Sequence, residues 1–456
     1  MSDTARMKRG LTANVVAIGT RIAIQFATLP ILFAFWDVEA VGAWLLLFAV
    51  PSYVALIGNG FAGAGGTAAL ASVQSGDMDR ARADFRAAWV ISAGSTGLLA
   101  LVFAAGALML APLLLESASE LDLKDIALAA AWLGLYVFAT SQMGIFDIAY
   151  RAVGRYPDHL FLYTAASLLE IVVLAAAVAS SDSFATLAAA LAAYRCLAAG
   201  FIWLRARRTA PAMFHAGGQR IAGSLPRLWA PSLAFMMMPL VFGLNLQGYL
   251  ILVGASFGTV ALAGFAATRT LTRLLDLANN LVYSMQFYES GYLGADRTAT
   301  QRRLLATMTC VSLFLIVTFA AVLLTLGPWI QSIYTLGETR FDHGVATVLI
   351  AAVAIRALAA TPAAFVAAEN AHAHFVSIYL VGSAAALGFA VVLASLGMSL
   401  PIVLMPLLLA ELSQLVPVFR QALSALELSI GDFARSLLSI ERWADLQAIW
   451  RKVTRT

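Results

Sequence analysis

The sequence predicts an all-α protein that crosses a membrane, with twelve transmembrane helices in two pseudo-symmetric six-helix lobes around a central cavity. Three observations lead to this fold class. The chain is 61% hydrophobic and only 12% charged, whereas a soluble domain has about 25% charged residues. Apolar runs of about 18 residues or more, long enough to span a bilayer, recur along the whole chain. Lysines and arginines gather in alternate segments between these runs.

The first apolar run follows directly on the N-terminal residues MSDTARMKRG. It is too long for the apolar region of a signal peptide, so we expect a retained first span. Turn residues and charges divide the rest of the chain into further runs. The predicted spans are residues 11–35, 41–63, 87–112, 125–148, 159–180, 184–204, 228–254, 258–286, 304–328, 343–366, 375–396 and 400–420.

The placement of positive charge tests this count. Of the 29 lysines and arginines, only Lys124 and Arg340 fall in segments on the side opposite to the N-terminus. Because cytoplasmic loops carry the Lys/Arg excess, both termini are predicted to be cytoplasmic. Without the polar segment 258–286 as a span, the distribution would reverse downstream of it.

A weak internal repeat underlies the two lobes. A shift of about 220 residues lays the first six spans over the last six and brings Asn59 onto Asn279. The expected divisions are an N-terminal lobe over 1–204, a cytoplasmic basic linker over 205–227, a C-terminal lobe over 228–420 and a cytoplasmic amphipathic tail over 421–456. Apolar residues among the charges of the tail predict a helix that lies on the membrane surface, with a solvated tail as the alternative.

Several arginines fall near the centres of spans: Arg21, Arg195, Arg269, Arg273 and Arg356. On insertion scales each costs about 2.5 to 3.5 kcal/mol at mid-bilayer, so we expect these side chains to face a protein-lined interior. Polar residues at helical spacing accompany them. These residues are Asn14 and Gln25 around Arg21, Asp276, Asn279 and Asn280 after Arg273, and Asn245 in the preceding span.

Acidic residues within spans offer partners for some of these arginines. Glu170 and Arg195 lie equally far from the turn between their spans, which predicts a structural ion pair. Asp276 is expected to hold Arg273 or Arg269, at helical spacing.

The remaining positive charge has two readings. Arg356 lacks an acid unless Glu411 reaches it, and Arg21 has no obvious acid. Since a guanidinium group suits phosphate oxygens, the excess charge indicates an anionic passenger. A purely structural role for the arginines is the alternative.

Other functional classes find little support. The two cysteines lie far apart and the five histidines are scattered near span ends, so we expect no metal site. The net charge of +4 follows the membrane topology and predicts no nucleic-acid partner. The outward loops are too short for a catalytic domain, and no catalytic residues are assigned.

The chain resembles the bacterial polysaccharide (O-antigen/exopolysaccharide) flippases of the multidrug/oligosaccharidyl-lipid/polysaccharide (MOP) exporter superfamily. The resemblance rests on NVVAIGTRIAIQFATLPILF, on VGAWLLLFAVPSYVALIGNGF, on the loop SVQSGDMDRARADFR and on the twelve-span layout. It implies an inner-membrane protein that moves an undecaprenyl-pyrophosphate-linked glycan across the bilayer by alternating access. It also implies that Arg21, Arg269 and Arg273, with Arg356 as a weaker candidate, bind the substrate, and that polysaccharide polymerase machinery is a candidate partner.

Two alternatives stay open. A MATE-like drug/cation antiporter of the same superfamily would use a membrane-embedded acid, whereas the first span carries Arg21. A membrane-embedded glycan polymerase or ligase would need larger outward loops. No cofactor is expected, and coupling to H⁺ or Na⁺ is left open.

Overall fold

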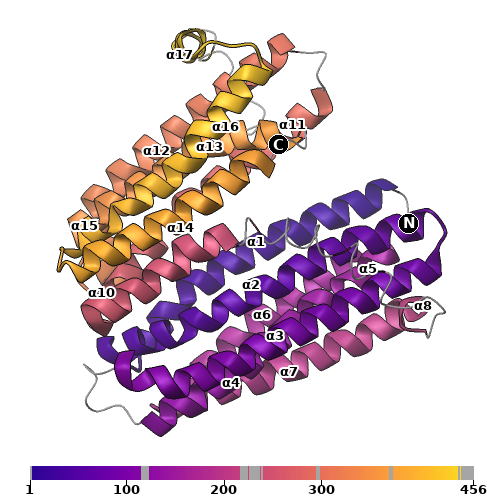
Figure 1. Cartoon of the computed structure of the whole chain (residues 1–456), viewed down its shortest axis with the longest axis vertical. Coiled ribbons are helices and arrows are strands. Elements are labelled where there is room, and N and C mark those ends of the chain that lie inside the picture. The colour runs from indigo at the N-terminus through magenta and orange to yellow at the C-terminus, as the bar shows by residue number, and fades with distance from the viewer. Residues whose placement is uncertain are drawn as a thin grey trace. The chain divides into compact units, whose positions relative to one another are not determined.

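The computed structural model describes residues 3–114, 123–215, 240–293, 298–368 and 373–439, together with residues 224, 228, 237 and 442. These residues form helices and short connections, without a strand among them. The chain forms two compact units (Figure 1). Unit 1 comprises Met1–Ala263 with Tyr334–Glu338, and unit 2 comprises Gly264–Ile333 with Thr339–Thr456.

Unit 1 contains long helices and a few short ones. Their bounds are α1 Asp3–Phe33, α2 Val38–Gln74, α3 Met78–Leu114, α4 Leu123–Ile145, α5 Asp147–Ala152, α6 Tyr156–Ser180, α7 Phe184–Thr209 and α8 Pro211–Phe214. A π-helix, η2 Leu244–Gly248, leads into α10 Tyr249–Thr272, whose first part belongs to this unit.

Unit 2 begins within α10. Its further helices are α11 Leu274–Leu293, α12 Thr298–Tyr334, α13 His343–Ala368, α14 Ala373–Ser395, α15 Leu400–Leu404, α16 Pro406–Ala425 and α17 Ile430–Leu437. The predicted lobe boundaries follow the sequence repeat, whereas the compact units follow packing. The division at 204 and 228 therefore stays a prediction.

A turn at Gly258 divides α10 into the ends of two spans. Gly258 has φ 84° and ψ 175°, a backbone conformation that is essentially restricted to glycine. In a continuous helix, the eight residues from Gly254 to Leu262 would advance about 12 Å. Instead, a Cβ on Gly254 would lie only 2.9 Å from Leu262 Cδ2. The chain thus reverses where the sequence predicts it, between the spans 228–254 and 258–286.

With this reversal, the helices account for the predicted spans. Ten helical segments of the described residues are long and apolar enough to cross a membrane. One of them, Leu240–Phe287, contains the turn at Gly258 and so provides two spans. The 37-residue helix α2 provides another. The described part of the chain therefore has the helices of a twelve-span, multi-pass membrane protein.

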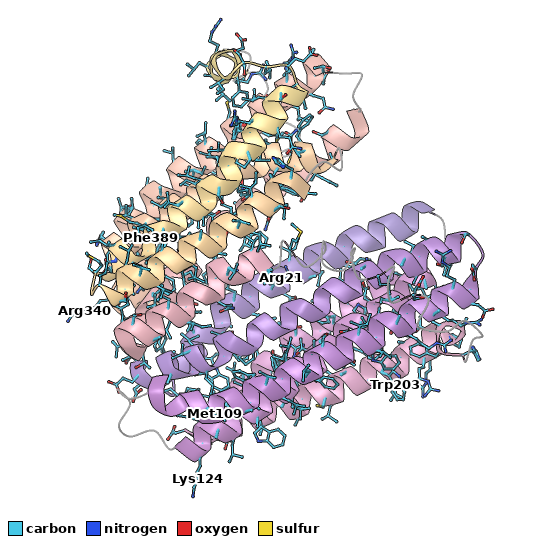
Figure 2. The ribbon with its side chains drawn as sticks, in the orientation of Figure 1. Arg21, Met109, Lys124, Trp203, Arg340 and Phe389 are labelled. Atoms are coloured by element: carbon cyan, nitrogen blue, oxygen red, sulfur yellow. The ribbon has the colours of Figure 1, made fainter. Side chains whose placement is uncertain are left out.

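The outer surfaces of both units are apolar, as expected for contact with lipid. Large side chains such as Met109 on α3 and Phe389 on α14 are 79% and 49% exposed and project outward (Figure 2). Inside, small residues allow close helix contacts. A Cβ on Gly65 of α2 would lie 2.5 Å from the Cβ of Ala88 on α3. Such small-residue contacts are typical of membrane helices, which gain little from burying apolar surface.

Arginines gather at one end of unit 1. The side chain of Arg82, near the start of α3, donates from Nε to Ala212 O beyond the end of α7, at 2.8 Å. Arg207, in the last turn of α7, places its guanidinium 4.9 Å from the Trp203 ring centre. Lys124 lies at the start of α4, at the other end of the same unit (Figure 2). This separation is the one that the positive-inside rule requires.

Candidate functional site

A buried ion pair joins α6 and α7 in unit 1. Arg195 Nε contacts Glu170 Oε2, and the two side chains are only 6% and 16% exposed. Tyr136 of α4 donates its hydroxyl to Glu170 Oε1 at 2.9 Å, and its ring centre lies 5.4 Å from the guanidinium of Arg195. The pair is the one that the sequence predicts. The carboxylate of Glu170 therefore neutralises Arg195 within the unit, and the residues of this cluster come from three helices.

A second buried ionic cluster joins four helices of unit 2. Arg356 of α13 lies with Nε 3.3 Å from Asp276 Oδ1 of α11. Its NH1 lies 3.6 Å from Oε1 of Glu411, a fully buried residue of α16. Tyr379 of α14 donates its hydroxyl to Glu411 Oε2 at 2.8 Å. This cluster contains one cation and two carboxyl groups, so its guanidinium has no excess charge to offer a ligand.

The cluster adds a partner that the sequence analysis did not expect for Asp276. Asp276 contacts Arg356 on another helix, because α11 and α13 lie side by side and an arginine from α13 reaches the carboxylate across their interface. The expected pairing of Asp276 with Arg273 or Arg269 stays a prediction. The sequence analysis left Arg356 without an acid unless Glu411 reaches it. In the structure Glu411 does reach Arg356.

Arg21 on α1 has a different environment (Figure 2). Its side chain is exposed, and the structure records no ion pair for it among the residues described. It lies close enough to Tyr156, at the start of α6, for its charge to act on the phenol. One helical turn further, the buried Nε2 of Gln25 has no hydrogen-bond partner within the described part of the chain. Two donor groups thus share one face of α1.

Arg269 and Arg273 lie on consecutive turns of the chain leading into α11. The guanidinium of Arg269 lies 5.6 Å from the ring centre of Phe265. The charges of the two arginines are near enough to repel each other. The helix continues through this point, because the Arg273 amide bonds to Arg269 O at 3.1 Å and the Leu277 amide to Arg273 O at 3.3 Å. The predicted polar stripe therefore has the expected helical spacing.

The predicted supporting residues take separate roles. Asn279 is buried and accepts a hydrogen bond from Ser312 of α12 at 3.3 Å, so it connects two helices. Asn280 is exposed. Asn245 is 4% exposed and lies within the π-helix η2. The side chain of Asn14 falls outside the described residues.

Other polar groups of the interior are ones that the sequence analysis missed. The hydroxyls of Tyr136 and Tyr379 complete the two ionic clusters, and a lone tyrosine in an apolar run gives no signal of such a role. His159 lies in the first turn of α6, near the end of its span, and its partners were not foreseen. It is 5% exposed, with Nδ1 3.3 Å from Asp147 Oδ1 and Nε2 2.9 Å from Met143 O. The π-helix was also missed; such helices are frequent at functional sites.

Comparison with protein-family models and with curated proteins gave no match. Solved structures, however, share the fold. An inward-facing multidrug resistance MATE family transporter of the MOP superfamily matches with a TM-score of 0.64 and 14% identity, over 90% of this chain and 94% of that one. A MATE protein in a bent conformation matches with a TM-score of 0.57 and 14% identity, over 93% and 96%.

A third solved structure is a MOP superfamily transporter from Pyrococcus furiosus Vc1. It matches with a TM-score of 0.54 and 15% identity, over 93% of this chain and 96% of that one. At such identities the likeness establishes the fold. The chain has the fold of the MATE transporters of the MOP superfamily.

Proposed function

We propose that the chain is an alternating-access transporter that moves a polyprenyl-pyrophosphate-linked oligosaccharide across the bacterial inner membrane. Support for a transporter comes from the fold, which solved MOP superfamily transporters share along nearly the whole chain. Support for an anionic substrate comes from the arginines within the spans. No catalytic role is proposed for any of them.

The observation that carries the proposal is the pair of donor groups on α1. Arg21 exposes a guanidinium on a membrane-spanning helix, and the buried amide nitrogen of Gln25 lies one turn away. A guanidinium on a span is costly unless a partner or water satisfies it. A pyrophosphate would accept from both groups, and bonds from arginine to phosphate oxygens are among the strongest hydrogen bonds in proteins.

Arg269 and Arg273 complete the proposed set of headgroup-binding residues. Two like charges on consecutive turns repel each other, and a dianionic ligand would relieve that repulsion. Arg356 is given no part in binding, because Asp276 and Glu411 already neutralise it.

The test is a leaflet-exchange assay with the Arg21→Gln variant. Protein in vesicles is given a polyprenyl-pyrophosphate oligosaccharide with a fluorescent sugar, and an impermeant reductant reports the fraction left in the inner leaflet. Loss of one charged hydrogen bond, about 1.5 to 3 kcal/mol, should weaken headgroup binding and slow exchange about ten-fold or more at low substrate.

Arg340→Gln is the matched control. Arg340 is also exposed but lies in the turn after α12, where its backbone oxygen accepts a hydrogen bond from Gln331 Nε2 at 3.1 Å. This variant should exchange the lipid at the wild-type rate. Equal exchange rates for Arg21→Gln and wild type would show that α1 does not bind the headgroup.

A drug/cation antiporter is the second candidate, favoured by the likeness to a multidrug resistance MATE transporter. In the Pyrococcus furiosus transporter of this fold, the reverse polarity of the binding pocket suggests a different function. Pocket charge is therefore the feature that separates the candidates. Vesicles that accumulate ethidium with a pH or Na⁺ gradient, and leave the labelled lipid in place, would establish the antiporter instead.

A further inference from the structure

The end of α16 and the helix α17 form a fixed corner of unit 2. After Ala425 the chain turns back, and the Leu428 amide bonds to Leu423 O at 2.9 Å. Arg302 of α12 donates from Nε to Leu426 O at 2.8 Å. The rings of Phe419 and Phe433 meet edge to face, with centres 5.7 Å apart. Figure 1 shows that α17 runs across the direction of α16.

The apolar residues of α17 cover two faces with different neighbours. Phe433 is 6% exposed and packs on the unit, and the backbone oxygen of Leu437 lies 3.6 Å from Cys310 Sγ. Ile430, at the start of α17, and Leu438, directly after its end, are 75% and 88% exposed. An amphipathic helix that crosses the end of a membrane span would place such a face among lipid acyl chains.

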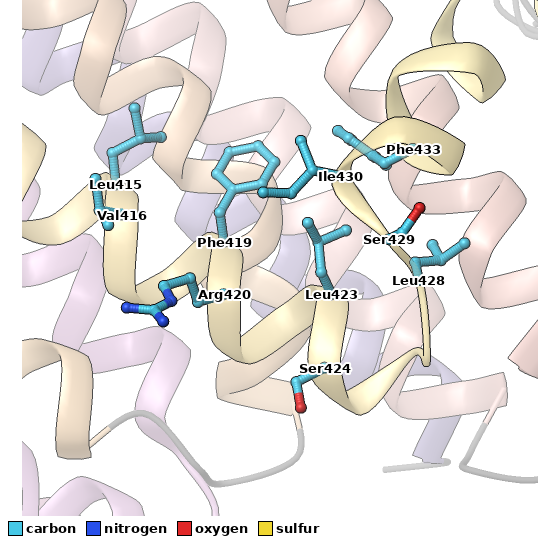
Figure 3. Close-up of a pocket in the computed structure, with 10 residues that line it drawn as sticks. All are labelled: Leu415, Val416, Phe419, Arg420, Leu423, Ser424, Leu428, Ser429, Ile430 and Phe433. Carbon is cyan, nitrogen blue, oxygen red and sulfur yellow. The ribbon is translucent and has the colours of Figure 1, made fainter.

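An apolar groove of about 800 Å³ opens between α16 and α17 (Figure 3). This volume is within the usual range of small-ligand sites. The apolar part of its lining includes Leu415, Val416, Phe419, Leu423, Ile430 and Phe433. The groove thus continues the exposed apolar face of α17 into the unit.

One charged residue lines this groove. Arg420 is exposed on α16, and no ion pair is recorded for it in the described part of the chain. Arg435 of α17, by contrast, lies with NH2 3.5 Å from Asp432 Oδ1 on its own helix. The groove therefore combines an apolar channel with one uncompensated cation, which is the complement of an acyl chain attached to a phosphate.

We propose that the α16–α17 groove binds a membrane phospholipid with an anionic headgroup. One acyl chain lies along Phe419 and Ile430, and the phosphate lies against Arg420. The lipid would hold α17 to the membrane surface at this corner. The site is independent of the transport proposal, because it uses none of the proposed headgroup-binding residues.

The experiment is native mass spectrometry of the delipidated full chain titrated with phosphatidylglycerol, and in parallel with phosphatidylcholine. Wild type should bind one phosphatidylglycerol more tightly than any phosphatidylcholine. Arg420→Gln should weaken phosphatidylglycerol binding about five-fold and leave phosphatidylcholine binding unchanged, because one surface cation contributes about 1 kcal/mol toward an anionic lipid. Arg435→Gln is the matched control and should bind both lipids as wild type does.

A second measurement locates the lipid. A phosphatidylglycerol with a photoreactive diazirine in its acyl chain should label peptides spanning residues 415–433 in wild type. Ser424→Trp, which fills the groove, should abolish this labelling. Equal phosphatidylglycerol affinity in the Arg420 and Arg435 variants would overturn the proposal, as would labelling confined to other helices.

Discussion

Arg195 and Arg356 are each surrounded by a glutamate and a tyrosine whose hydroxyl donates to that glutamate. The spans that supply these residues differ between the units. In unit 1 the order along the chain is tyrosine, glutamate, arginine; in unit 2 it is arginine, tyrosine, glutamate. The same chemistry thus recurs in the last three spans of each half with the residues permuted, which helps to explain why the repeat is weak in sequence.

The ion pair of unit 1 can be tested by removing its cation. Arg195→Met would leave Glu170 buried without its partner, and breaking such a pair typically costs about 3 to 5 kcal/mol. We expect a markedly lower Tm in detergent, measured by tryptophan fluorescence. Adding Glu170→Gln should recover part of the loss, because a neutral amide oxygen can still accept from Tyr136.

The control is Arg208→Met, an exposed position near the end of the same helix. It should leave Tm close to wild type. A Tm for Arg195→Met that equals that of Arg208→Met would mean that the buried pair contributes nothing to stability.

An ion pair between two spans could be predicted only where the spans are consecutive, because the order of the helices then shows which residues lie at the same depth in the membrane. Glu170 and Arg195 are on adjacent spans joined by a short turn, so equal distances from the turn bring them together. Asp276 offered no such constraint, since its partner Arg356 comes from a helix that is not its neighbour in sequence. Which helices touch is decided by packing, and a single sequence does not show it.

At the scale of helices, close packing depends on individual glycines. A Cβ on Gly382 of α14 would lie 2.1 Å from Ser413 Oγ of α16, closer than any real contact. The same two helices carry Tyr379 and Glu411 of the ionic cluster. The approach at Gly382 therefore supports the position of a buried charge.

Gly382→Val should push α14 and α16 apart and lower Tm, because forcing extra atoms into a tight contact costs typically about 1 to 3 kcal/mol. Gly388→Val on the same helix is the control, since a Cβ there meets nothing within 4 Å. Differential melting of the two purified variants checks this. Similar Tm values for both variants would show that α14 and α16 can move apart without a loss of stability.

Spans were predictable and local irregularities were not. Hydropathy is a property of long segments, so it located the helices and the reversal near Gly258. The π-helix Leu244–Gly248 depends on a single inserted residue in the hydrogen-bond pattern, which leaves no mark on hydropathy.

At the scale of the molecule, the charge distribution predicts an orientation. The helix α7 is 26 residues long, about 39 Å, enough to cross a bilayer. Asp182, just before it, is expected outside, and Arg208 near its end is expected in the cytoplasm.

Cysteine labelling in whole cells checks this orientation. After Cys196 and Cys310 are replaced by alanine, Asp182→Cys should react with an impermeant maleimide in intact cells. Arg208→Cys should react only after the membrane is permeabilised. The opposite pattern would invert the predicted topology.

The fold could be predicted from the sequence, whereas the substrate could not. Likeness at 14% identity extends over 90% of the chain, because apolar segments and small contact residues can be supplied by many different sequences. The substrate depends on a few polar side chains, and the proposed partners of Arg21 and Gln25 are ligand atoms, which the sequence does not specify.

The two ionic clusters also bear on how the chain enters the membrane during synthesis. Glu170 and Arg195 occupy successive segments. If the translocon releases the two segments as one hairpin, an electrically neutral pair is inserted into the bilayer. Arg356 emerges after Asp276 but well before Glu411. Its first counter-ion is therefore already in place when its own segment leaves the ribosome, and the second arrives with the last span.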